Sequence, residues 1–300
     1  MQRCENGGGN IIPQRARWFP LDAHIITLDT IESDFGRMRT FVETSFNIQR
    51  RVIAALILRD MRTRFGNSLF GFILIVALPL SHLLILMLVY LALRGRIPLL
   101  GTNATVFWGT AVLPYILCVY PARMTATSLS QNRPLLTYPI VKSIDVIAAR
   151  GVLEVLVAFW VAGIFCLVLI LCGVDIMPNN IFDAIAAMLA TICLGFSVGC
   201  LSAVLVALVP AWSIIQMALL LIMYFTSGVF FLPSALPERL QYWVSFNPLM
   251  HSVEWLRSAY YEGHGYGLLD RGYIFSFSTI LIFAALVIER FARGKVMMRR

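Results

Sequence analysis

The sequence predicts an all-α integral membrane protein with six transmembrane helices, an N-terminal amphipathic helix in the membrane interface, and a re-entrant outer helix pair between the fifth and sixth spans. Hydrophobic residues make up 59% of the chain and charged residues only 13%, a composition outside the range of soluble domains. Several apolar windows reach the roughly 20 residues that a helix needs to cross hydrocarbon. The period-two alternation of a membrane barrel is absent, so helices are the spanning structure.

Six windows are candidate spans, although the second carries Arg123 near one end and the last is short. Prolines in the first two spans predict breaks in these helices. Such breaks occur both along transport paths and in passive bundles. The six windows are Leu69–Leu93, Asn103–Ala126, Val152–Val174, Ala184–Val209, Ala211–Leu232 and Tyr273–Ile288.

The basic residues indicate how the chain is oriented. The net charge is +8, and most Lys and Arg residues lie before the first span, between the second and third spans, and after the sixth. The positive-inside rule therefore predicts a multi-pass protein with both termini in the cytoplasm. This distribution favours a membrane over a nucleic acid as the reason for the positive charge. The residues before Leu69 contain no apolar signal-peptide core, so we expect no cleaved signal peptide.

The polar N-terminal part divides into two segments before the six-helix domain of residues 69–300. Residues 1–40 are polar and lack a clear period, which predicts a flexible cytoplasmic extension. Residues 41–68 combine helically spaced apolar residues with basic ones, which predicts an amphipathic helix in the headgroup plane. A solvated basic flank is the alternative interpretation of this segment.

Two segments outside the spans have unusual composition. The predicted cytoplasmic segment 128–151 mixes exposed aliphatic residues with basic ones, which suits a surface that docks on a soluble partner. It contains a short helix-capable run, 144–150, with Ser143 as its N-cap. On the outer side, a helix beginning at Pro237-Glu238 and a second one after Asn247-Pro248 are too short to span and rich in aromatic residues, as re-entrant or belt helices are.

Two features inside the predicted spans are of interest, an intramembrane carboxylate and a pair of glycines. Glu154 is an intramembrane carboxylate and so a functional candidate, but it lies one turn from Arg150 and the two can form an interfacial ion pair. Gly195 and Gly199 form a GxxxG pattern, which permits close helix approach.

The chain lacks the usual motifs for chemistry. Gly294-Lys295 is followed by Val296, so no Walker A motif is present and we expect no ATP bound through such a motif. The six cysteines form no CxxC pair and the four histidines have no ligand spacing, so we expect packing roles and no metal site. No catalytic residues are predicted. An enzyme is disfavoured.

Three blocks carry a resemblance to a known family: RDMRTRFGNSLFGF from Arg59, NRPLLTYPIVKSIDVIAARGVLE from Asn132, and SGVFFLPSALPERLQYWVSFNPLMHSVEWLRSAYYEG from Ser227. Together they resemble ABC-2 type transporter permeases of the capsular polysaccharide export family, including those for polysialic acid. The likeness runs from about Arg50 to the C-terminus. The first and third blocks are common among ABC-2 permeases, whereas the second is closer to the capsule branch.

The resemblance implies a six-helix permease in the bacterial inner membrane that exports a lipid-linked polysaccharide. Its partners would be two copies of a separately encoded ABC ATPase, a second copy of this chain, and periplasmic and outer-membrane polysaccharide export proteins. ATP and Mg would bind to the ATPase, with no cofactor in this chain. The candidate ATPase-docking residues are Arg59, Asp60, Arg64, Phe65, Arg133, Pro134, Lys142, Asp145 and Arg150.

A second group of residues is predicted to lie along the substrate path. Aromatic side chains offer stacking faces to sugar rings, arginines attract acidic groups, and each aromatic can instead be an interfacial anchor. Glu254 and Arg257 can simply pair with each other. An exporter of O-antigen or another lipid-linked glycan is one alternative function, and an ATPase-independent secondary transporter or a membrane glycolipid enzyme is another. The path candidates are Trp108, Tyr115, Tyr120, Arg123, Trp160, Tyr242, Trp243, Asn247, Pro248, Glu254 and Arg257.

Overall fold

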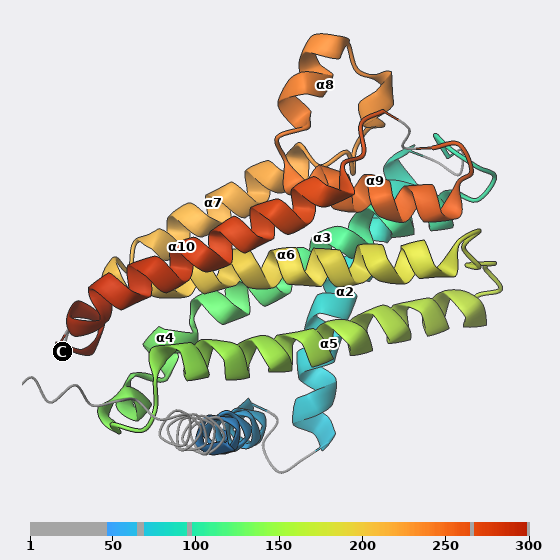
Figure 1. The fold of residues 1–300 in the computed structure, drawn as a ribbon. Coiled ribbons are helices and arrows are strands. Elements are labelled where there is room, and N and C mark those ends of the chain that lie inside the picture. Colours follow the sequence, from blue (N-terminus) through green and yellow to red (C-terminus); the bar gives the residue numbers. More distant parts are fainter. Residues whose placement is uncertain (1–46, 65–68, 95–97, 265–266, 299–300) are drawn as a thin grey trace, which may run out of the picture. The chain divides into compact units, whose positions relative to one another are not determined.

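The described residues form a bundle of α-helices without β-strands (Figure 1). The structure is a computed structural model that describes residues 47–64, 69–94, 98–264 and 267–298. The chain divides into two units, Met1–Asn47 and Ile48–Arg300, and the helical bundle belongs to the second. The predicted extension, 1–40, lies outside the described residues.

The elements follow one another in a simple order. A helix over residues 47–64, here called the N-terminal helix, confirms the helical part of the predicted amphipathic segment. The remaining elements are α2 (Leu69–Arg94), α3 (Ala104–Ala126), α4 (Ser128–Gln131), η1 (Arg133–Thr137), α5 (Ser143–Leu171), α6 (Ile181–Leu208), α7 (Trp212–Phe225), η2 (Pro233–Ala235), α8 (Glu238–Val244), α9 (Pro248–Tyr260) and α10 (Arg271–Met298).

Five of the six predicted spans correspond to helices long and apolar enough to cross a membrane. These helices cover Ile73–Leu93, Ala104–Gln131, Ser143–Leu171, Ile181–Leu208 and Arg271–Ala292. The fifth predicted span, Ala211–Leu232, differs, because its helix α7 has only 14 residues. At 1.5 Å per residue α7 is about 21 Å long and falls short of the hydrocarbon thickness. The apolar run continues to Leu232 as a turn that contains Gly228 at positive φ.

Helix α5 is longer than the sequence predicted. The expected short helix 144–150 and the expected span from Val152 form one continuous helix, with Lys142 as N-cap in place of Ser143. Asp145 favours this start, because its carboxylate accepts a hydrogen bond of 3.1 Å from the backbone N–H of Lys142. Gly151 does not end the helix, since it lies in the middle of α5 with the Phe196 ring packed against it.

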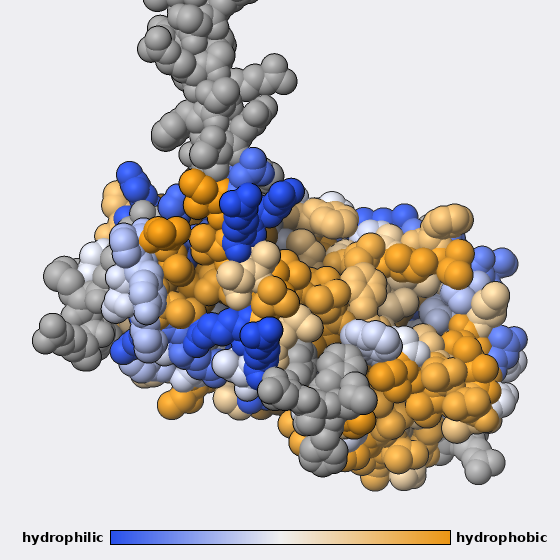
Figure 2. Space-filling view, turned by 90° about the horizontal axis from the view of Figure 1, so that it is seen from below, coloured by the Kyte–Doolittle hydropathy of each residue, from blue (hydrophilic) through white to orange (hydrophobic). Residues whose placement is uncertain are grey.

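The surface of the bundle is strongly apolar where the long helices are exposed. Figure 2 shows one such face, on which hydrophobic residues cover much of the surface, while hydrophilic residues gather mainly towards one side and also lie along the opposite edge. On α2 and α5 the exposed large side chains include Ile73, Leu78, Phe159, Trp160 and Leu167. Apolar surfaces of this extent indicate contact with lipid or with another protein chain.

Helix α3 lies at the centre of the bundle and packs most closely against α6. Gly195 and Gly199 of α6 face α3, where a Cβ on Gly195 would collide with the backbone of Cys118 and a Cβ on Gly199 would lie 2.6 Å from Cβ of Thr125. The GxxxG pattern therefore allows two helix backbones to approach closely, as the sequence predicted.

We expect Gly195→Ala to destabilise the protein by about 1 to 3 kcal/mol, the usual range for overpacking a tight interface. The new methyl group collides with backbone of α3, so α3 and α6 must move apart. Gly163→Ala is the matched control, because a Cβ on Gly163 of α5 meets nothing within 4 Å. Thermal unfolding of the detergent-solubilised protein measures the difference, and equal melting of the two variants would contradict the tight contact.

Candidate functional site

The N-terminal helix is joined to the end of the bundle formed by α4, η1 and the start of α5. Near its start, Nε2 of Gln49 donates a hydrogen bond of 2.7 Å to Oδ1 of Asp145. Further along, Nη1 of Arg59 donates one of 2.7 Å to Oδ1 of Asn132. These bonds connect the amphipathic helix with two parts of the segment that the sequence predicts as a docking surface, at Asn132 and at Asp145.

A third connection is a cluster of four charged residues, Asp60, Arg64, Arg150 and Glu154, here called the ionic cluster. Nη1 of Arg150 lies 3.2 Å from Oδ2 of Asp60, and its Nε lies 3.6 Å from Oε1 of Glu154. Nη1 of Arg64 lies 2.5 Å from the same oxygen of Glu154. Nη2 of Arg150 also donates a hydrogen bond of 2.7 Å to Gln131.

The ionic cluster is almost removed from solvent and formally neutral. Asp60, Arg150 and Glu154 are each 5% exposed or less, and two positive charges face two negative ones. Burying unpaired charges is costly, whereas paired and hydrogen-bonded ones are tolerated. The predicted ion pair between Arg150 and Glu154 is confirmed, and the structure adds two residues of the N-terminal helix to it.

These contacts divide the candidate docking residues into two groups. Asp60, Arg64, Asp145 and Arg150 contact other parts of the subunit, and Arg59 does so while remaining partly exposed. Arg133, Pro134 and Lys142 lie at least partly at the surface, and Phe65 lies outside the described residues. Docking itself stays a prediction for all of them. Sequence reasoning missed Gln49, Gln131 and Asn132, whose roles depend on contacts 19 to 96 residues apart.

At the other end of the bundle, α8 and α9 are the two short helices that the sequence predicted, but they lie in different surroundings. Helix α8 projects from the bundle in Figure 1, and its Tyr242 and Trp243 are 61% and 65% exposed. Helix α9 is largely buried and packs against α3, α6 and α10. Its N-cap is Asn247, whose Oδ1 accepts a hydrogen bond from the backbone N–H of Leu249.

A second buried ion pair holds α9 against its neighbours. Nη1 of Arg257 lies 3.0 Å from Oε1 of Glu254 and donates a hydrogen bond of 2.9 Å to the carbonyl oxygen of Gly228. Its guanidinium group also lies 4.7 Å from the ring centre of Phe107. Burial by itself would raise the pKa of Glu254, but the hydrogen bond from His264 and the charge of Arg257 together lower this pKa below its usual value. The carboxylate is therefore ionised at neutral pH.

The other path candidates are also divided by burial. Trp108 and Tyr115 are buried and stack on Tyr90 and Tyr224, with ring centres 4.8 Å and 3.9 Å apart. The predicted pairing of Glu254 with Arg257 is confirmed. Asn247, Pro248, Glu254 and Arg257 are likewise buried, whereas Tyr120 is half-buried and Arg123, Trp160, Tyr242 and Trp243 are exposed. In this single subunit only the second group is accessible from outside the protein.

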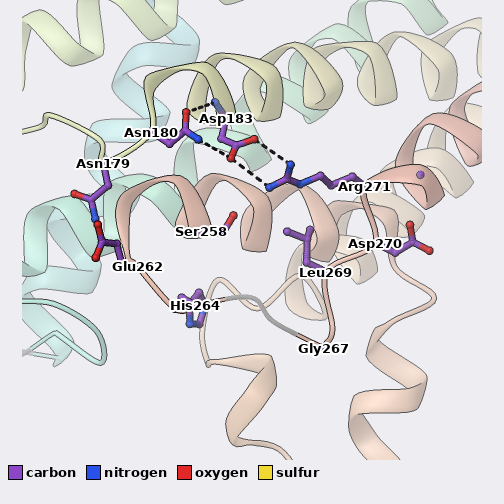
Figure 3. A pocket seen from close by; sticks show the side chains of 12 residues that line it. Asn179, Asn180, Asp183, Ser258, Glu262, His264, Gly267, Leu269, Asp270 and Arg271 are labelled. Carbon is purple, nitrogen blue, oxygen red and sulfur yellow. Dashed lines mark hydrogen bonds and ion pairs between the residues drawn. The ribbon is translucent and has the colours of Figure 1, made fainter.

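A polar pocket of about 850 Å³ lies where the start of α6, the end of α9 and the start of α10 meet (Figure 3). Arg271 binds Asp183 at 3.1 Å there, and Glu262 and Asp270 also line the pocket. The pocket has more carboxylates than arginines. It therefore favours cations and hydroxyl donors over anionic groups. Among the described residues no cluster of His, Cys, Asp and Glu side chains has the arrangement of a metal site.

Comparison with known proteins identifies related transport proteins. The chain is 27% identical to the polysialic acid transport protein KpsM of Escherichia coli over 82% of this chain and 95% of that protein. It is 27% identical to the capsule polysaccharide export inner-membrane protein CtrC of Neisseria meningitidis, over 85% of this chain and 96% of that protein. For the capsule polysaccharide export inner-membrane protein BexB of Haemophilus influenzae the identity is 25%, over 87% and 98%.

The family model of the ABC-2 type transporter matches residues 51–261. This range begins in the N-terminal helix and ends after α9, so it includes the ionic cluster and the Glu254–Arg257 pair. The part of the chain that the structure describes contains five helices long and apolar enough to cross a membrane. Because the family model matches most of the sequence, the chain belongs to the ABC-2 type transporter family.

Proposed function

We propose that this chain is the transmembrane permease subunit of an ATP-driven exporter, which moves a lipid-linked capsular polysaccharide across the bacterial inner membrane. The observation that supports this most strongly is the similarity to three capsule or polysialic acid transport proteins over nearly their entire length. A separately encoded ABC ATPase would bind ATP and Mg and supply the energy. Two ATPase copies would act on two copies of this chain, with both termini in the cytoplasm.

The contacts of the N-terminal helix suggest how force would reach the membrane helices. In the proposed complex the ATPase touches the segment of Arg133 and Lys142, between α4 and α5. Closure of the two ATPases would push this segment, and the ionic cluster would transmit the movement to the N-terminal helix and α5 together. The polymer would then pass between the two permease copies towards periplasmic and outer-membrane export proteins. The exposed aromatic residues of α8 would meet it near the exit.

A pair of charge reversals at the docking surface tests this proposal. We expect Arg133→Glu with Lys142→Glu to reduce the amount of copurified ATPase by about tenfold, equivalent to 1.4 kcal/mol, because two favourable charges become repulsive. Surface polysaccharide should fall in parallel while polymer accumulates inside the cells. Arg239→Glu on α8 is the control, because Arg239 is exposed and follows directly on Glu238 at the start of the helix that projects from the bundle.

Other outcomes would favour the alternative functions. Export that continues without any ATPase and depends on an ion gradient would indicate a secondary transporter. Turnover of a glycolipid by the purified chain alone would indicate an enzyme. Normal export by the double variant, with the ATPase lost from the complex, would also contradict the proposal.

A further inference from the structure

An apolar groove of about 200 Å³ runs between α5 and α10, with α6 beneath it. Ile144 and Ala148 line it from α5, Phe196 and Cys200 from α6, and Ala285 and Glu289 from α10. The groove lies entirely within described residues. Its walls are apolar except at Glu289, so a ligand that fills it must be apolar along most of its length.

The position of the groove on candidate membrane spans indicates that lipid surrounds it. All three helices are candidate membrane spans, and Leu286 on its wall is 43% exposed. An apolar groove open to the side of a membrane helix faces hydrocarbon, and water gains few hydrogen bonds there. A lipid acyl chain has the shape and the chemistry to fill such a groove.

The side chain of Phe196 forms part of one wall of the groove. Its ring packs where Gly151 has no Cβ, and a methyl group on Gly151 would collide with it. The ring is thereby held against the backbone of α5, at one wall of the groove.

Glu289 is the charged residue among those that line the groove. It is only 2% exposed and lies on α10 near the end of the membrane span at Ala292, across from Ile144, the second residue of α5. The carboxylate is therefore at headgroup depth, beside the apolar part of the groove. A carboxylate accepts several hydrogen bonds, so it can hold a ligand ammonium group in addition to its contacts within the protein. A glycolipid with an anionic headgroup is disfavoured at this position.

We propose that the groove binds one acyl chain of a bilayer phospholipid with an ethanolamine headgroup, whose ammonium group contacts Glu289. Arg290, which follows Glu289 on α10, and Lys142, which precedes α5, are both exposed and would place positive charge near the phosphate at the same end. Several groove residues, among them Cys200 and Ala285, belong to the apolar cluster that also contains Leu56 of the N-terminal helix. The bound lipid would thus stabilise the end of the bundle that carries the ionic cluster.

Native mass spectrometry of the protein, released from nanodiscs with equal amounts of phosphatidylethanolamine and phosphatidylglycerol of identical acyl chains, tests this site. We expect the unmodified protein to retain phosphatidylethanolamine about tenfold more than phosphatidylglycerol, a ratio that corresponds to 1.4 kcal/mol. Glu289→Gln should bring this ratio close to one. Ala148→Trp should reduce retention of both lipids about tenfold, because the indole fills the groove.

A control variant shows whether the effect of Ala148→Trp is specific to the groove. Ile280→Trp adds the same side chain at a position of α10 that is 64% exposed and outside the groove, so it should retain lipid like the unmodified protein. If Ala148→Trp fails to fold, Glu289→Gln alone decides through the lipid ratio. An unchanged ratio in Glu289→Gln, unchanged retention in a folded Ala148→Trp protein, or retention of a glycolipid from cells in place of phosphatidylethanolamine would each overturn the proposal.

Discussion

Arg150→Ala should lower the free energy of unfolding by about 3 to 5 kcal/mol, the range found when one partner of a buried ion pair is removed. Arg150 contacts Asp60 and Glu154 and also Gln131, so its loss leaves Asp60 buried without its strongest partner. The N-terminal helix should then separate from α5. Faster hydrogen exchange in residues 47–64, together with a lower melting temperature, would measure this separation.

Arg62→Ala is the control for this prediction, because Arg62 lies on the exposed side of the same helix. It should leave the melting temperature nearly unchanged, as surface charges usually do. The double variant Asp60→Leu with Arg150→Met should recover part of the stability, since it removes both charges of the pair together. Equal melting of Arg150→Ala and Arg62→Ala would show that the cluster contributes little.

Glu254→Gln should have the second largest effect, again about 3 to 5 kcal/mol. Arg257 is completely buried, and the substitution leaves its positive charge without the carboxylate. The lowered pKa of Glu254 also indicates that the ionised carboxylate stabilises the folded protein. Because the folded protein favours the ionised form, the pair stabilises the fold at neutral pH, and this contribution is lost as the pH falls through that lowered pKa.

Thermal unfolding at neutral pH provides the measurement, with Glu262→Gln as the control. Glu262 is exposed and two residues beyond the end of α9, so the same chemical change there should cost little. A Glu254→Gln protein that melts like the control would indicate that Arg257 finds another partner.

Much of the architecture could be predicted because membrane insertion depends on local composition. The long apolar windows, the amphipathic segment before them and the Pro-marked starts of α8 and α9 are all readable within short stretches. The length of α7 could not be read in this way. Its apolar run continues through Thr226–Leu232, and hydropathy does not distinguish a helix from a turn that other helices cover.

The sequence predicted which residue types form the candidate site, but it predicted only some of the pairs that these residues form. The i, i+4 spacing indicated Arg150 with Glu154, and the i, i+3 spacing indicated Glu254 with Arg257, because such residues are neighbours on a helix. The attachment of Arg64 to Glu154 and of Gln49 to Asp145 joins residues 90 and 96 positions apart. No local rule covers such pairs, since they depend on how helices pack.

Because α7 is short, the polar backbone groups that follow it need hydrogen-bond partners within the protein. A backbone without helical hydrogen bonds is tolerated at membrane depth only where protein or water satisfies its polar groups. Two side chains of α9 and its N-cap supply part of these bonds: Asn247 donates to the carbonyl oxygen of Met223 in the last turn of α7 at 2.7 Å, and Arg257 donates to that of Gly228 at 2.9 Å. The end of α7 and the turn after it are therefore tethered to α9, and any rearrangement of this turn must carry α9 along or break both bonds.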